Sequence, residues 1–249
     1  APEELCGGIP ARDMRGLIEQ IFNAIEEALF NGKTEAQIGG CKIDLAKFFD
    51  TLPTEASTDV LARLGAPQRL VQLMQEAAEK QKRWIEAGGF VHPEPLSRKR
   101  GVIAGCPASM MQTAAVMACW IMHLRSTGAG MGCFVDDRCM WAQGPDAAAT
   151  LEAAVQKTAE FDADMRLEWN NSKGETFGSN PGLRSALGAV AEKVSPKHPT
   201  KASFELLGTE MHLSARRAVK RTSKAGKDGV TMEKRVETIL RRIPIATSS

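Results

Sequence analysis

The sequence predicts an α+β fold in which an antiparallel sheet is backed by helices. Two observations favour this class. Helical and strand-like segments are neither strictly alternating nor segregated along the chain, which fits a mixed arrangement with helices on one face of a sheet. Short apolar runs joined by turn residues are typical of hairpins. The 249 residues, 43% of them hydrophobic, suffice for one large domain or two small ones.

The helical segments are recognised by apolar residues spaced three and four apart. The first follows Asp13, a candidate N-cap, and the third begins at Pro107, which suits the first turn of a helix. The expected helical segments are 13–30, 53–87 with an interruption at 65–67, 107–125 and 146–166.

Two of the expected strands place acids at their ends. Residues 37–45 form a short apolar run that predicts a buried strand ending in Asp44. Residues 128–142 predict a hairpin whose tip carries Asp136 and Asp137. The other expected elements are a loop or edge hairpin at 88–101, a short strand at 167–169, a turn at 170–172 and a last hairpin at 204–213.

Composition argues against several classes of protein. No run of about 18 apolar residues occurs, so no membrane span is expected. The first residues lack the basic start and apolar core of a secretion signal. None of the six cysteines forms a CxxC pair and only four histidines occur, so no zinc-site spacing can be assembled. Buried free thiols indicate an intracellular, reducing compartment, with nucleus and cytoplasm both open.

Positive charge gathers near the end of the sequence. The net charge is only +2, yet residues 214–242 carry ten Lys or Arg against three acids. A basic tail on a nearly neutral body suggests contact with a phosphate backbone. A solvated tail without a partner remains the alternative.

The acids at the strand end and hairpin tip are the candidates for chemistry. A lone Asp44 closing an apolar strand is costly to bury unless it is paired or bound to metal. Adjacent carboxylates at Asp136 and Asp137 repel each other unless a cation offsets them. Together the three could hold two magnesium ions for an in-line phosphoryl displacement. Taken singly, Asp44 could instead cap a turn, and the pair could be ordinary turn residues.

At these positions the sequence resembles the reverse transcriptases, especially those of non-LTR retrotransposons. Asp44-Leu45-Ala46-Lys47-Phe48-Phe49-Asp50 is similar to their first palm motif. Phe134-Val135-Asp136-Asp137 is similar to their aromatic-x-Asp-Asp hairpin. Residues 100–109 resemble the second motif, a Gly-rich turn into a helix. Further resemblances are to a fingers motif at 7–12 and to the fourth and fifth palm motifs at 167–173 and 204–208.

The resemblance implies a right-hand polymerase palm with an antiparallel sheet, partial fingers and the start of a thumb. It also implies that the chain is part of a larger retroelement polyprotein with other domains. The expected division is 1–36 partial fingers, 37–56 palm with the first motif, 57–99 a helical insertion of fingers or palm, 100–214 palm, and 215–249 the basic start of a thumb.

The resemblance also assigns roles to individual residues. Asp44, Asp136 and Asp137 would bind two Mg²⁺ ions, with Mn²⁺ as an alternative, and Lys173 would be the general acid for the departing pyrophosphate. Phe49 would exclude a 2′-hydroxyl from the nucleotide sugar, and the alternative is that it is an ordinary core residue. The alternative for Lys173 is that it is a solvated surface lysine. The other implied contacts are Leu45 through its carbonyl, Ala104, Gly105, Pro107 and Phe134 for substrate, and Phe204, Leu206, Leu207 and Gly208 for the primer.

The implied function is RNA-templated DNA synthesis, with an RNA template, a DNA primer and dNTPs as partners and no membrane. Two departures from the family pattern stand out: Ala104 replaces a Gln that contacts nucleotide or template, and Phe134 replaces a Tyr. The alternatives are a catalytically impaired nucleic-acid-binding remnant and an RNA-dependent RNA polymerase. An RNA-dependent RNA polymerase would carry a second Asp at the position that Phe49 occupies in this chain. A helical scaffold protein would leave the ordered motifs to coincidence.

Overall fold

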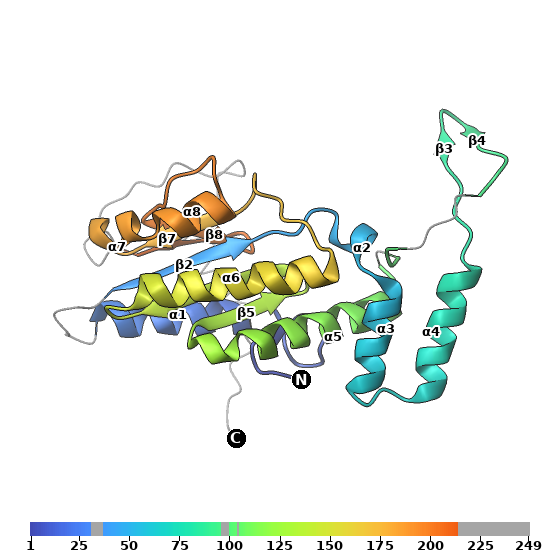
Figure 1. The fold of residues 1–249 in the computed structure, drawn as a ribbon, viewed down its shortest axis with the longest axis horizontal. Helices are drawn as coiled ribbons and strands as arrows, with labels where there is room; N and C mark the ends of the chain where they lie inside the picture. Colours follow the sequence, from blue (N-terminus) through green and yellow to red (C-terminus); the bar gives the residue numbers. More distant parts are fainter. Residues whose placement is uncertain (31–36, 96–99, 104, 214–249) are drawn as a thin grey trace, which may run out of the picture.

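The chain folds around a five-stranded sheet with the strand order β1-β5-β6-β2-β7. The computed structural model describes residues 1–30, 37–95, 100–103 and 105–213 (Figure 1). All pairings in this sheet are antiparallel except the one between β1 and β5, which is parallel. The strands are β1 (Leu5–Cys6), β2 (Ile38–Ile43), β5 (Gly130–Phe134), β6 (Asp137–Gln143) and β7 (Glu175–Gly178).

Helices cover one face of the sheet, as the sequence predicts. The apolar side chains of α5 (Pro107–Leu124) and α6 (Ala147–Met165) enclose one core with alternate residues of β2, β5 and β6. The short helices α7 (Pro181–Ala186) and α8 (Gly188–Val194) complete this layer. Because side chains alternate across a strand, the other residues of the same strands face the opposite side.

The face of the sheet away from α5 and α6 is covered only in part. The helix that covers it is α1 (Met14–Phe30), although the sequence predicted helices on one face alone. A second core joins α1 to the sheet and to a separate hairpin of β8 (Ser203–Leu206) and β9 (Thr209–His212). Phe177 of β7 and Phe204 of β8 stack with ring centroids 3.7 Å apart. This stack fixes the hairpin to the sheet beside the middle of β2, because Phe177 pairs with Gly40.

A helical pair extends from one end of the molecule (Figure 1). It consists of α3 (Thr54–Arg63) and α4 (Gln68–Lys80), and α3 packs against α5. The helix expected over 68–87 ends at Lys80, since Gln81 is extended, and a small hairpin of β3 (Glu86–Ala87) and β4 (Phe90–Val91) follows further along the chain. Strand β4 lies where the sequence left open a loop or an edge hairpin, whereas β3 falls on residues expected to be helical.

Most long elements were predicted and most short ones were not. The helices α1, α5 and α6, strand β2 and the hairpins β5–β6 and β8–β9 confirm the prediction. The strand expected at 167–169 is reduced to one bridge between Leu45 and Trp169. The short elements β1, β7, α7, α8 and α2 (Phe48–Thr51) were missed. Among the helices that the structure describes, none is long and apolar enough to cross a membrane.

Candidate active site

Strand pairing brings Asp44 and Asp137 together from distant parts of the sequence. The antiparallel register of β2 and β6 pairs Ile43 with Arg138. Continuing the register by one residue places Asp44 opposite Asp137, at the end of the ladder. Side chains alternate across the sheet, so both acids lie on the face away from α5 and α6. This is the face that α1 covers only in part.

Asp136 lies in the tight turn between β5 and β6. The last pair of this hairpin is Phe134 with Asp137, so Val135 and Asp136 form its two-residue tip. Val135 has a φ of 60°, which is strained for a β-branched residue. A Cβ at Gly7 would lie 2.9 Å from two ring atoms of Phe134, so only glycine permits this packing. The N-terminal segment therefore supports a strained tip, a feature that clusters at functional sites.

Asp136 in the tip and Asp137 beside it are held in an environment that is unfavourable for negative charge. Burial raises the pKa of Asp136, and the neighbouring carboxylates of Asp137 and Asp44 raise it further. Burial also raises the pKa of Asp137, and Asp44 adds to that shift, whereas Lys42 and Lys173 oppose it. The three carboxylates therefore form one electrostatically coupled group, in which a bound cation would relieve the mutual repulsion.

Lys173 reaches the acids through backbone pairing of the segment before it. The N–H of Asn170 donates to the Asp44 carbonyl over 2.8 Å, and Trp169 bridges to Leu45. The Nζ atom of Lys173 then lies 3.6 Å from Oδ1 of Asp44. The Lys173 side chain is 66% exposed, so this ion pair contributes little to stability. It does place a proton-bearing group beside the carboxylates.

Lys42 is a site residue that the sequence interpretation missed. It precedes Asp44 by two residues on β2 and therefore shares its face of the sheet. Its Nζ donates to the Glu205 carbonyl over 3.0 Å and lies 3.8 Å from Oε2 of Glu175. Lys42 thus links the strand that leads to Asp44 with the hairpin β8–β9. The alternation of side chains along the predicted strand was the signal that could have found it.

The chemistry of the three carboxylates suits a hard divalent cation such as Mg²⁺. Asp44, Asp136 and Asp137 offer oxygen ligands, and Asp136 and Asp137 are partly buried. Within the described ranges, no three His, Cys, Asp or Glu side chains come close enough together to hold a metal ion. Asp44 instead lies beside Lys173. The three carboxylates as they lie therefore do not form a closed metal site, and their sharing of a cation is a proposal.

Phe49 lies just beyond Asp44, in the short helix α2. Its half-buried ring meets Phe48 edge-on with centroids 5.6 Å apart. Its carbonyl accepts from the N–H of Val102 over 2.7 Å, which ties α2 to the start of the second motif. A Cβ at Gly101 would lie 2.5 Å from the Asp50 carbonyl, so this close approach needs glycine.

The turn before α5 contains the other expected substrate contacts. Gly105 has a φ of +84° and is exposed, and no atom lies within 4 Å of the position of a Cβ there. Its conformation rather than its space therefore favours glycine. Pro107 is the first residue of α5 and is also exposed. Ala104 lies outside the described residues.

The hairpin β8–β9 separates the four residues expected at the primer into two kinds. Phe204 is 3% exposed and Leu206 is fully buried, so their side chains are not available to a primer. Leu207 and Gly208 form the turn, with φ values of 50° and 77°, and they are half-buried and exposed respectively. Phe204 and Leu206 therefore anchor the hairpin through their buried side chains, and contact of any of the four residues with a primer stays a prediction.

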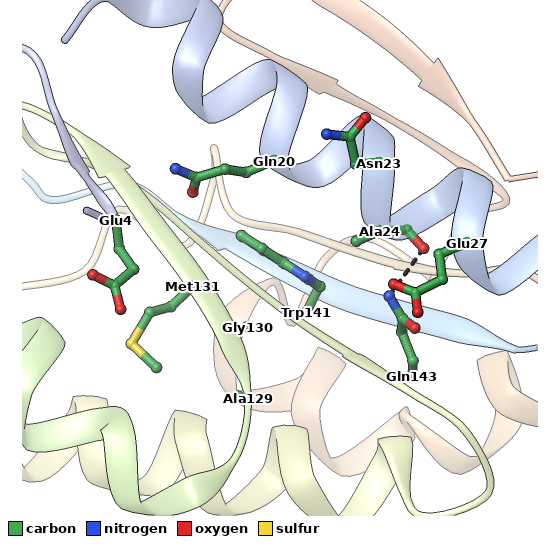
Figure 2. A pocket seen from close by; sticks show the side chains of 10 residues that line it. All are labelled: Glu4, Gln20, Asn23, Ala24, Glu27, Ala129, Gly130, Met131, Trp141 and Gln143. Atoms are coloured by element: carbon green, nitrogen blue, oxygen red, sulfur yellow. Dashed lines mark hydrogen bonds between the residues drawn. The ribbon is translucent and has the colours of Figure 1, made fainter. Parts of the chain in front are cut away.

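A hollow of about 460 Å³ lies elsewhere, between α1 and the far ends of β5 and β6. Ala24 and Gln143 both line it, and the dashed line in Figure 2 marks the hydrogen bond of 3.0 Å that Gln143 donates to the Ala24 carbonyl. Glu4, Trp141 and Met131 are among the residues that line it. None of the predicted site residues does, so this hollow does not belong to the acidic site.

The raised pKa values predict how pH affects the stability of the metal-free chain. The folded chain binds a proton at Asp136 more tightly than the unfolded chain does, in which the pKa of this carboxyl has its ordinary value of 3.8. The free energy of unfolding therefore falls as the pH rises from the unfolded-state pKa of Asp136 through its higher folded-state pKa. Asp136→Asn should raise Tm by about 2 °C at pH 7 in EDTA, and the gain should vanish toward pH 4. Calorimetry of both chains measures this, and an equal or lower Tm at pH 7 contradicts it.

Known structures share this fold at low sequence identity. The apo telomerase of Candida tropicalis, truncated from the C-terminal domain, matches with a TM-score of 0.61 and 12% identity over 84% of this chain and 39% of that one. Telomerase of Candida albicans, solved with the TWJ fragment of telomeric RNA, matches with a TM-score of 0.56 and 13% identity over 84% of this chain and 33% of that one. The chain thus spans well under half of these structures. The chain has the fold of the matching part of these structures.

A family model for reverse transcriptase (RNA-dependent DNA polymerase) matches residues 11–211, which is most of the chain. The protein belongs to the reverse transcriptase family. No curated protein sequence matches it. The match is to the family as a whole, so the non-LTR subtype stays a prediction.

Proposed function

We propose that the chain carries the catalytic centre of an RNA-directed DNA polymerase, which transfers a nucleotide from a dNTP to the 3′-hydroxyl of a primer. The observation that carries the proposal is the grouping of Asp44, Asp136 and Asp137 at one end of a sheet, with Lys173 beside them. Membership of the reverse transcriptase family supports this assignment.

In the proposed reaction, the 3′-hydroxyl of the primer gives its proton to water, its oxygen forms a new bond to the α-phosphorus of the dNTP, and the bond from that phosphorus to pyrophosphate breaks. Asp44, Asp136 and Asp137 would hold two divalent cations, Mg²⁺ or Mn²⁺, which stabilise charge on the attacking and leaving oxygens. The Leu45 carbonyl would assist at the same strand end. Lys173 would give its proton to the departing pyrophosphate. The chain's contribution is then mainly position and electrostatics.

The remaining contacts are proposed around this centre. Phe134, Gly105 and Pro107 would shape the place of the nascent base pair, and the tip of β8–β9 would meet the primer. The basic residues of 216–242 lie outside the described residues, and their proposed role is to track the duplex backbone. A larger retroelement polyprotein, the division into fingers, palm and thumb, and a non-LTR parent belong to the same proposal.

The direct experiment is primer extension on poly(rA)·oligo(dT) with dTTP and Mg²⁺ or Mn²⁺. The proposal expects extension that EDTA abolishes. The second candidate, an impaired nucleic-acid-binding remnant, is favoured by Ala104 in place of the family's Gln. It expects salt-dependent binding of the duplex without extension. That result would overturn the polymerase proposal for this chain.

Phe49→Ala should relax the choice of sugar. If the ring lies beneath the nucleotide sugar, removing it opens space for a 2′-hydroxyl. Discrimination against ribonucleotides should fall roughly 10- to 100-fold, as single-group changes in a pocket usually allow. The measurement is kcat/KM for dTTP against UTP on the same template. Phe161→Ala, a half-buried Phe on α6, is the control. Unchanged discrimination would leave Phe49 as a core residue.

Lys173→Gln should slow the chemical step without weakening nucleotide binding. Losing a general acid costs about 10²- to 10⁴-fold. The expected result is a fall of about 100-fold in the single-turnover rate, with KM for dTTP within a factor of about three. Lys197→Gln, at another exposed lysine, is the matched control. A rate equal to that of the control would make Lys173 an ordinary surface residue.

A further inference from the structure

A buried charge pair lies directly beneath the acidic site. Arg138 follows Asp137 on β6 and is 0% exposed, on the face toward α5 and α6. Its guanidinium donates two parallel hydrogen bonds to Asp162 of α6, over 2.8 and 2.7 Å. The Trp120 ring of α5 lies 5.3 Å from the guanidinium carbon, within range of a cation–π contact.

Asp162 binds a second strand end as well. Its Oδ2 atom also accepts from the indole N–H of Trp169. Trp169 bridges to Leu45, the neighbour of Asp44, while Arg138 is the neighbour of Asp137. One buried carboxylate therefore holds the backbone on both sides of the strand ends that carry the acids. We call these three residues, Arg138, Asp162 and Trp169, the clamp.

Stability alone does not account for the clamp. Moving a guanidinium and a carboxylate out of water is costly, and well-packed apolar residues of similar volume often serve stability as well or better. The Nε atom of Arg138 has no hydrogen-bond partner among the described residues, so the pair is not fully satisfied. The hydrogen bonds of Asp162, however, are directional, so they fix the position and orientation of a strand end more closely than apolar packing does.

We propose that the clamp is a positioning device for the acidic site: by tying Arg138 and Trp169 to one carboxylate, it sets Asp44 relative to Asp136 and Asp137. Its effect on DNA synthesis rests on the proposed function. Its effect on the placement of the acids does not. The clamp residues touch neither substrate nor the reacting atoms and act through the backbone of their neighbours.

The test replaces the charges without leaving one of them alone in the core. In Arg138→Met/Asp162→Leu, both partners become apolar, so the Tm of the metal-free chain should return close to that of the parent. Trp169→Phe is the milder variant, because it keeps an aromatic ring, although a smaller one, and removes the N–H that donates to Asp162. Asn180→Ala is the control for destabilisation: it removes an N-cap of α7 at the far end of the sheet.

Two readouts separate positioning from simple folding. The first is the affinity of the full chain for Mn²⁺, measured by titration with an EPR readout. The double variant should bind Mn²⁺ about 10- to 100-fold more weakly, the range typical of supporting partners of metal ligands. The second is primer extension, in which kcat should fall by a similar factor while KM for the primer–template changes by less than about threefold. Asn180→Ala should leave both unchanged.

The outcomes also distinguish the two proposals. A folded double variant with the parent's Mn²⁺ affinity and kcat overturns the clamp as a positioning device. If the parent binds Mn²⁺ but extends no primer, the polymerase proposal fails, while a loss of Mn²⁺ affinity in the double variant still supports the clamp. If Asn180→Ala weakens Mn²⁺ binding as much as the double variant does, the effect is general destabilisation and the clamp proposal fails.

Discussion

Asp136→Asn is expected to abolish DNA synthesis, with a loss of about 10³-fold or more in the single-turnover rate. Asp136 occupies the tip of the β5–β6 hairpin, where Asp137 and Asp44 already raise its pKa together with burial. Replacing its carboxylate by an amide keeps the shape and removes a negative charge that a divalent cation would need. The fold should survive, because the repulsion among the acids is relieved.

The measurement is incorporation of one dTTP on poly(rA)·oligo(dT) by a stoichiometric amount of protein. Asp146→Asn supplies the matched control, since Asp146 is an exposed residue just before α6 and belongs to no proposed site. Circular dichroism and Tm of all three chains establish that they are folded. Retention of more than about a tenth of the parent's rate by Asp136→Asn would contradict its role at the centre.

Arg138→Met alone is expected to destabilise the chain severely. It leaves the Asp162 carboxylate, 2% exposed, without its ionic partner inside the protein. Breaking a buried pair in this way costs about 3–5 kcal/mol. For a chain of this size that corresponds to a fall in Tm of roughly 10 °C. Thermal unfolding followed by circular dichroism measures it.

The companion variants give this prediction its control. Asp162→Leu added to Arg138→Met should restore most of the lost Tm, because no charge is then left unpaired in the core. Arg125→Met removes an exposed arginine paired with Glu4 and should change Tm little. An Arg138→Met chain as stable as the parent would contradict this prediction and would mean that the Asp162 carboxylate does not depend on Arg138 inside the protein.

The long elements and the three acids could be predicted because their signals are local. Helical spacing over 107–125 and 146–166 marks α5 and α6, and turn residues flanked by apolar runs mark the β5–β6 hairpin. The acids stand out because carboxylates at the ends of apolar strands are uncommon. The order of motifs then connected them to one family, which the family model supports.

The supporting residues could not be predicted because their meaning depends on tertiary pairing. Nothing local in Arg138 or Asp162 indicates that they meet, since they are joined only when β6 packs on α6. The short strand β7 carries a single large apolar residue, Phe177, so its pattern resembles a loop. The burial of Phe204 and Leu206, with Phe204 stacked on Phe177, likewise depends on tertiary packing, and their contact with a primer stays a prediction.

The most direct test of one shared acidic centre is a double-mutant cycle between Asp44→Asn and Asp137→Asn, read as the single-turnover rate of dTTP incorporation. Residues that act as a unit are strongly non-additive. If β2 and β6 bring both carboxylates into one site, the double variant should lose about as much as the worse of the two single variants. If the two losses instead multiply, Asp44 and Asp137 act independently, and the account of a single centre is contradicted.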